Sequence, residues 1–142
     1  MDIQDLDEVI SLESSNPGTR WSMNMFVEEM KNPSGHCFVM KMEDRPKQRV
    51  VGFICFRNVE EESDLFNICV HSDYRRLGVG KRLMGFYVEF GRLRGIKTFY
   101  LEVLSSNQPA IRLYQLFSYE SSGMRKKFYQ GKFDALLMTK KA

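Results

Sequence analysis

One loop of the 142-residue chain has the residue types and spacing of an anion-binding site: Arg75-Arg76-Leu77-Gly78-Val79-Gly80-Lys81. Glycines let the backbone come close to a ligand, and the amides of a loop that opens a helix converge on an anion. Basic side chains stand on both sides of the two glycines. The loop therefore indicates a phosphate-bearing ligand, although a bare Gly-x-Gly pair is more often a tight turn.

Two well-known phosphate loops do not match this segment. The dinucleotide-binding fingerprint has a third glycine where this chain has Leu83. The nucleotide-binding P-loop has a longer stretch between its glycines and Ser or Thr after its lysine, whereas here only Val79 intervenes and Arg82 follows. The remaining pattern suits the pyrophosphate of a cofactor other than NAD or ATP.

The second candidate for chemistry is Glu102, the one charged residue in the run TFYLEVL at residues 98–104. Side chains alternate between the two faces of a strand, so Glu102 shares a face with Tyr100 and Leu104. Both faces are otherwise apolar, as in a strand that is covered on each side. The pattern alone fits equally well an acid–base catalyst and an ion-paired glutamate near a strand end.

A third candidate is Tyr114, two turns into a helix that we expect to begin at Pro109 with Ser106 or Asn107 as its cap. A tyrosine at this helical spacing is more often a core aromatic than a functional group.

Periodicity and turn residues predict the elements that must position these groups. The expected helices are residues 6–12, 22–30, 80–94 and 109–117, and the expected strands are residues 37–42, 50–57, 65–70, 99–104, 127–129 and 136–138. A strand–helix–strand unit makes its two strands parallel and places a ligand at their carboxyl ends. We therefore predict an α/β fold in one domain, residues 1–142, with a mixed central sheet flanked by helices.

Composition excludes several other classes of protein. The net charge of +3 is too small to indicate a nucleic-acid binder, and no apolar run approaches the about 20 residues that cross a membrane. Cys37, Cys55 and Cys69 are odd in number, lie in apolar runs and form no Cys-x-x-Cys pair. We expect a cytoplasmic protein with reduced cysteines, no metal site, and no direct binding to nucleic acid or membrane.

The loop resembles the signature Q/R-x-x-G-x-G/A of the GNAT acetyltransferase superfamily. The pattern LEV-x-x-SN-x-x-A-I-x-LY, matched at every fixed position by residues 101–114, resembles the RimI-type protein N-terminal acetyltransferases. The resemblance covers nearly the whole chain. It implies acetyl-CoA as cosubstrate, no metal, and transfer of the acetyl group to a primary amine, with the N-terminal α-amine of a protein such as a ribosomal protein as the leading acceptor.

The resemblance also implies roles for single residues. The pyrophosphate cradle carries over to Arg76, Leu77, Gly78, Val79, Gly80 and Lys81. The strand end Ile68, Cys69 and Val70 carries over as the partner of the pantetheine and acetyl groups, and Asn107 as a coenzyme A contact. The family's general base corresponds to Glu102 and its general acid to Tyr114. Direct transfer needs no cysteine nucleophile, and we take the backbone N–H of Val70 as the donor to the developing oxyanion.

Three departures from the family and two alternatives accompany this interpretation. The family's first strand is missing or truncated, Ser118 replaces a glycine after the helix of Tyr114, and Phe128 and Phe133 replace a Tyr and a Glu near the acceptor site. One alternative is a GNAT enzyme that acetylates a small amine such as a polyamine, an amino acid or an aminoglycoside. The other is a non-catalytic acyl-CoA-binding module, against which the presence of both the glutamate and the tyrosine argues.

Overall fold

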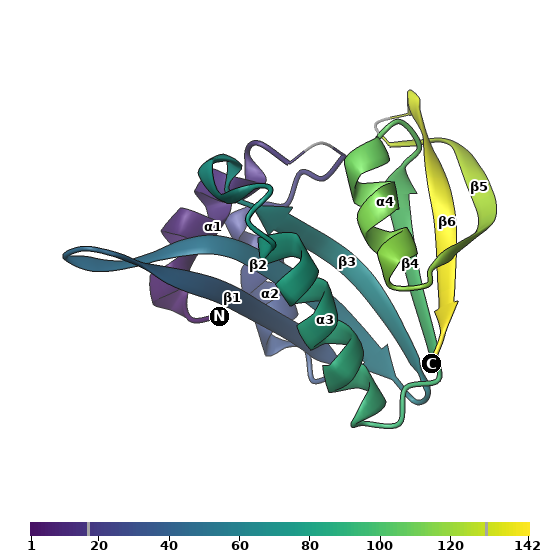
Figure 1. Ribbon diagram of the computed structural model, residues 1–142, viewed down its shortest axis with the longest axis horizontal. Helices are drawn as coiled ribbons and strands as arrows, with labels where there is room; N and C mark the ends of the chain where they lie inside the picture. The colour runs from purple at the N-terminus through teal and green to yellow at the C-terminus, as the bar shows by residue number, and fades with distance from the viewer. Residues whose placement is uncertain (17, 130) are drawn as a thin grey trace.

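A six-stranded mixed sheet lies at the centre of the computed structural model (Figure 1). The structure describes residues 1–16, 18–129 and 131–142. The strands are β1 (Gly35–Asp44), β2 (Lys47–Val59), β3 (Glu62–Val70), β4 (Thr98–Leu104), β5 (Glu120–Tyr129) and β6 (Phe133–Lys141). The helices are α1 (Leu6–Glu13), α2 (Met23–Lys31), α3 (Val79–Arg92) and α4 (Gln108–Leu116), with short 3-10 turns at Ile3–Asp5 and Ser72–Tyr74. The strand order is β1-β2-β3-β4-β6-β5. Among the strands of the described residues, only β3 and β4 pair in parallel. The predicted α/β fold is confirmed.

The largest difference from the predicted elements is β5, which begins at Glu120 rather than at residue 127. Its first seven residues, ESSGMRK, have no apolar alternation, so periodicity could not identify them as a strand. Pairing with β6 produces the strand instead, with Glu120 opposite Thr139 and Arg125 opposite Ala135. This strand borders the candidate site, so the prediction missed part of the site as well.

Helices cover both faces of the sheet because the apolar side chains of β2 point alternately to each face. Val50, Phe53 and Cys55 pack with α1 and α2. Val51, Ile54 and Phe56 pack into the larger cluster with residues of α3 and α4. Each face therefore has its own core. No helix of the described residues is long and apolar enough to span a bilayer.

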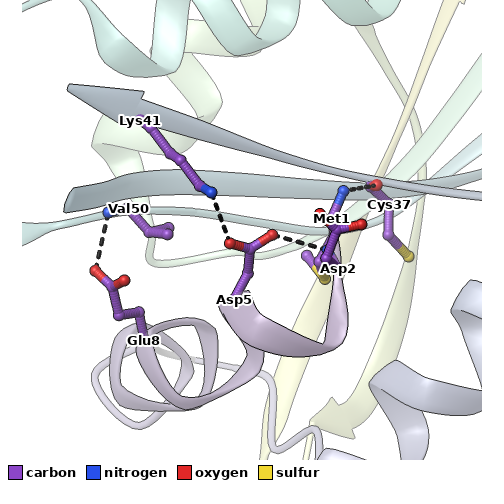
Figure 2. Close-up of polar contacts among 7 residues, drawn as sticks. All are labelled: Met1, Asp2, Asp5, Glu8, Cys37, Lys41 and Val50. Carbon is purple, nitrogen blue, oxygen red and sulfur yellow. Dashed lines mark hydrogen bonds and ion pairs between the residues drawn. The ribbon is translucent and has the colours of Figure 1, made fainter. Parts of the chain in front are cut away.

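The N-terminal segment is attached to the sheet by polar contacts instead of by a strand of its own, since no strand precedes β1 in the described residues (Figure 2). A carboxylate oxygen of Asp5 lies 2.9 Å from the ammonium of Lys41 on β1, and Asp2 N–H donates to the other oxygen at 2.8 Å. Val50 N–H of β2 donates to Glu8 at 2.9 Å. These contacts hold α1 against the half of the sheet that leads into β3.

The neighbouring parallel strands β3 and β4 pair only over residues 62–65 and 98–101. Beyond Leu65 and Leu101 they diverge, and Figure 1 shows the gap widening toward their carboxyl ends. The loop that opens α3 follows β3, and α4 follows β4. The ligand is predicted at the carboxyl ends of the two parallel strands, and there β3 and β4 leave a wedge between them.

The chain after α4 contains a conformation that favours glycine, because Ser118 has a φ of 68°. A left-handed non-glycine residue costs roughly 1 kcal/mol. We expect Ser118→Gly to raise the free energy of unfolding by about 1 kcal/mol and the melting temperature by roughly 3 °C. Denaturant and thermal unfolding measure both quantities.

The matched control is Ser11→Gly in the interior of α1, where glycine should lower the stability by about 0.5 kcal/mol. Equal effects of the two substitutions would contradict the argument from backbone strain.

Candidate active site

A cavity of about 1280 Å³ occupies the wedge between β3 and β4. It is lined by the carboxyl end of β3, the glycine loop, the first turn of α3, the end of β4 and α4. Its basic lining residues are Arg75, Arg76, Lys81 and Arg112, and its one acidic lining residue among those described is Glu102. The cavity is larger than most small-ligand pockets, and its charge suits an anionic ligand of the size of coenzyme A.

The first turn of α3 offers free backbone amides to this cavity. The first intrahelical hydrogen bond runs from Arg82 N–H to the carbonyl of Gly78 at 3.0 Å, which leaves the amides of residues 79–81 without a partner inside the helix. Gly78 is left-handed with a φ of 80°, and so is Arg76 with a φ of 67°. Together with the positive end of the helix dipole, this arrangement forms a fitting cradle for a pyrophosphate.

The unpaired edge of β3 also faces the cavity. His71 N–H donates to the carbonyl of Val51 at 2.8 Å, so alternation along the strand turns the N–H of Val70 away from β2 and toward the wedge. The carbonyl of Ile68 lies on the same edge, where it accepts a hydrogen bond from the Asn16 amide at 3.3 Å. This edge can pair with an extended ligand in the place that β4 leaves open.

Helix α4 closes the other side of the cavity. Asn107, one of the two residues expected to cap this helix, is its N-cap. The Asn107 side chain accepts a hydrogen bond from Ala110 N–H at 3.3 Å. Tyr114 is 5% exposed, lines the cavity and packs against Tyr119 with ring centroids 5.9 Å apart. Tyr114 is thus both a core aromatic and a lining residue of the cavity.

A second cavity, of about 1000 Å³, lies on the other side of Glu102. It shares four lining residues with the first cavity: Thr19, Leu65, Phe66 and Glu102. The Glu102 side chain is 29% exposed, and its Oε1 lies 3.4 Å from Nε of Arg125 on β5. The strand face that carries Glu102 is therefore half-buried rather than covered, which corrects the expectation from the apolar pattern. Glu102 on this face lines both cavities.

Charges in the second cavity are mixed. Asp64 and Glu102 are acidic, while Arg20 and Arg125 are basic. Burial raises the pKa of the Asp64 carboxyl above its ordinary value, and Arg57 opposes that rise. Trp21, Met25 and Phe128 add apolar surface. The cavity suits a ligand with both polar and apolar parts.

A buried carboxylate fixes the segment that separates the two cavities. Glu13, at the end of α1, is 3% exposed and accepts hydrogen bonds from Thr19 Oγ1 at 2.9 Å and from Trp21 N–H at 2.9 Å. It also accepts from Asn67 Nδ2 of β3 at 3.0 Å and from Asn16 Nδ2 at 3.1 Å. No sequence pattern indicates this network, because its members become neighbours only when α1 packs on β3.

Cys69 lines the first cavity, but its thiol is suited to packing rather than to nucleophilic attack. Burial raises its pKa to about 11, so the thiolate is scarce near neutral pH. The thiol donates to the carbonyl of Leu12 at 3.4 Å, on the α1 side of the sheet. Any contact of this residue with a ligand in the wedge is therefore through its backbone.

The structure brings nearly all predicted site residues to the first cavity. The lining includes Ile68, Cys69, Val70, Arg76, Gly78, Val79, Gly80, Lys81, Glu102, Asn107 and Tyr114. Leu77 is the exception: its side chain is 64% exposed and is not part of the lining. Prediction from the sequence missed Arg125, Glu13 and Arg112.

A sequence model of the acetyltransferase (GNAT) family matches residues 3–119. The chain belongs to this family. It is therefore an acetyl-CoA-dependent N-acetyltransferase, and the cationic wedge with free amides at the start of α3 fits that cosubstrate.

Similar proteins agree with this assignment. A ribosomal protein bS18-alanine N-acetyltransferase of Salmonella typhimurium is 36% identical over 93 residues, which span 63% of this chain and 63% of that protein. The crystal structure of the ribosomal-protein-S18-alanine N-acetyltransferase from Escherichia coli has a TM-score of 0.83 at 28% identity, over 98% of this chain and 88% of that chain. Arabidopsis thaliana NAA60 in complex with acetyl-CoA shares the fold, with a TM-score of 0.86 at 20% identity over 99% of this chain and 95% of that one.

The glycine loop yields a prediction about cosubstrate binding. A Cβ at Gly80 would lie 3.2 Å from Leu113 Cδ2 and 3.7 Å from Val70 Cγ2, so a valine there would crowd two residues that line the cavity. We expect Gly80→Val in this GNAT enzyme to weaken acetyl-CoA binding at least tenfold, or about 1.4 kcal/mol, by calorimetry.

Gly85→Val in the same helix is the control, because a Cβ there meets only Phe117 at 3.9 Å, away from the lining. Unchanged affinity in a folded Gly80→Val protein would contradict the cradle.

Proposed function

We propose that this GNAT enzyme acetylates the N-terminal α-amine of a protein, by direct attack of the amine on acetyl-CoA in a ternary complex. The observation that carries the proposal is the position of Glu102, which lines both cavities at the point where β3 and β4 part. The cosubstrate would occupy the cationic cavity, and the acceptor would reach the same carboxylate from the other side.

The second cavity favours a peptide over a small polyamine or aminoglycoside. A site for a small polycation is expected to be strongly acidic, whereas here two acidic and two basic side chains line about 1000 Å³. Its walls come from separate segments, around Trp21 on one side and Phe128 on the other. The bS18-alanine acetyltransferases among the similar proteins add support for an N-terminal acceptor such as a ribosomal protein. We expect a cytoplasmic enzyme, because its free cysteines suit a reducing compartment.

Glu102 supplies the base in this proposal. An alkylammonium is not a nucleophile, so a group near the acceptor must remove its proton. Glu102 lines both cavities, and its carboxylate can take the proton directly or through a water. Acetyl-CoA, when bound, supplies the acetyl group as an activated thioester.

Val70 and Tyr114 complete the proposed machinery. The N–H of Val70 faces the wedge and can donate to the negative charge that develops on the carbonyl oxygen. Tyr114 lines the same cavity, and its phenol can give a proton to the departing sulfur. The Cys69 thiol takes no part in this scheme, in keeping with its raised pKa.

The acceptor is tested with synthetic peptides that begin with alanine and also contain one internal lysine. We expect acetyl transfer to the first residue, located by fragmentation mass spectrometry, with kcat/KM at least about tenfold above that for polyamines or aminoglycosides. The same peptide with a blocked N-terminus is the control and should stay unmodified. Acetylation of the lysine alone, or faster turnover of small amines, would overturn the proposed acceptor.

The proton donor is tested by Tyr114→Phe. This change keeps the ring and its packing, so the stability should fall by no more than about 1.5 kcal/mol, while turnover falls by about 10²-fold or more.

Tyr119→Phe is the matched control. The Tyr119 hydroxyl is buried and lies near the Tyr87 hydroxyl, so its removal should leave turnover unchanged and lower the stability by no more than about 1.5 kcal/mol. Normal turnover of Tyr114→Phe would leave Tyr114 with a packing role alone.

A further inference from the structure

Arg125 is the charged partner of Glu102 in the second cavity. Its Nε lies 3.4 Å from Glu102 Oε1, and the two residues reach each other across β6, which separates β5 from β4. The distance is that of an ion pair, longer than the 2.7–2.9 Å typical of a charge-assisted hydrogen bond. One carboxylate oxygen is therefore drawn toward the acceptor side of the site.

Arg125 contacts an aromatic ring and lies where the strand pairing becomes irregular. Its guanidinium lies over the ring of Phe128, 4.8 Å from the ring centre, an arrangement that favours a cation. The pairing of β5 with β6 becomes irregular directly after Arg125, where Lys127 is left-handed and its N–H donates to Asp134 Oδ1 at 2.8 Å. This irregularity interrupts the strand register at the border of the second cavity.

Stability alone does not account for the ion pair. The side chains of Arg125 and Glu102 are 55% and 29% exposed, and pairs at such exposure contribute about 0–1 kcal/mol. The pair nevertheless occurs at the junction of the two cavities, on the carboxylate that the proposed function uses. The geometry points to a role in catalysis rather than in folding.

We propose that Arg125 is a positioning residue that holds the Glu102 carboxylate toward the acceptor amine through its ion pair with Oε1. This inference rests on the proposed function, in which Glu102 is the base. Arginine stays protonated at any working pH, so it can orient the carboxylate without exchanging a proton itself. Because the pair engages Oε1, the second oxygen is left to receive the proton of the acceptor.

Other charges near Glu102 are placed less directly. Asp64 and Arg20 line the same cavity, and no ion pair joins either of them to Glu102 in the part of the chain that the structure describes. Lys126, the neighbour of Arg125 along β5, pairs instead with Asp134 at 3.8 Å and is 81% exposed. Lys126 therefore offers a control that removes a cation from the same strand without touching Glu102.

A double-mutant cycle tests the inference. We would measure kcat/KM for an acceptor peptide, KM for acetyl-CoA and melting temperature for wild type, Glu102→Gln, Arg125→Gln and the double variant. Misplacing a catalytic group by about 1 Å can cost up to 10²-fold, so Arg125→Gln should lower kcat/KM by about tenfold to a hundredfold. The KM for acetyl-CoA and the melting temperature should hardly change.

The decisive result is the double variant. If Arg125 acts through Glu102, kcat/KM of the double variant should match that of Glu102→Gln within about twofold, because the carboxylate that Arg125 orients is already absent. Arg125→Lys, which keeps the charge, should recover part of the activity, and Lys126→Gln should behave as wild type.

Losses that multiply in the double variant would overturn the positioning role and leave the proposed function in place. A large fall in melting temperature for both Arg125 variants would likewise overturn it in favour of a structural role. Wild-type activity of Glu102→Gln would instead remove the base assignment, and this inference with it.

Discussion

The structure depends on the short pairing of two parallel strands. β3 and β4 share a ladder over only four positions each, residues 62–65 and 98–101, and then separate. Backbone groups at such a break need partners, because an unpaired strand edge away from water is costly. The chain meets part of this need with its own groups, such as the Asn16 amide on the carbonyl of Ile68. The remaining edge, with the N–H of Val70, faces a cavity that an extended ligand can fill.

The same break explains why two cavities meet at one carboxylate. Glu102 is the residue after Leu101, the last position of β4 that pairs with β3. It is therefore the first side chain on that strand that can border both sides of the gap. The Glu13 network maintains the gap from the other side, since it fixes the segment with Thr19 and Trp21 against Asn67 of β3. No cation pairs with this buried carboxylate in the part of the chain that the structure describes, and four hydrogen-bond donors satisfy it instead.

Features of the fold and site that depend on a few consecutive residues could be predicted from the sequence. The glycine loop and the cap of α4, expected at Ser106 or Asn107, each depend on a few consecutive residues, and both lie where the pattern places them. The ion pair of Arg125 could not be predicted in this way. Arg125 and Glu102 are brought together by the pairing of β5 with β6 and of β6 with β4. The first seven residues of β5 are mostly polar and do not indicate a strand.

The two interpretations that the sequence left open for Glu102, an ion-paired residue and an acid–base catalyst, do not exclude each other. A fully buried ion pair would be a poor base, because freeing the carboxylate from its partner would leave two desolvated charges. The pair seen here is partly exposed and 3.4 Å long, so its free energy is about 1 kcal/mol or less. A pair of that strength is enough to favour one orientation of the side chain, yet an arriving ammonium can compete with it for the carboxylate. In the proposed function, the position at the break in the sheet gives the acceptor access to Glu102, and the ion pair with Arg125 orients the side chain.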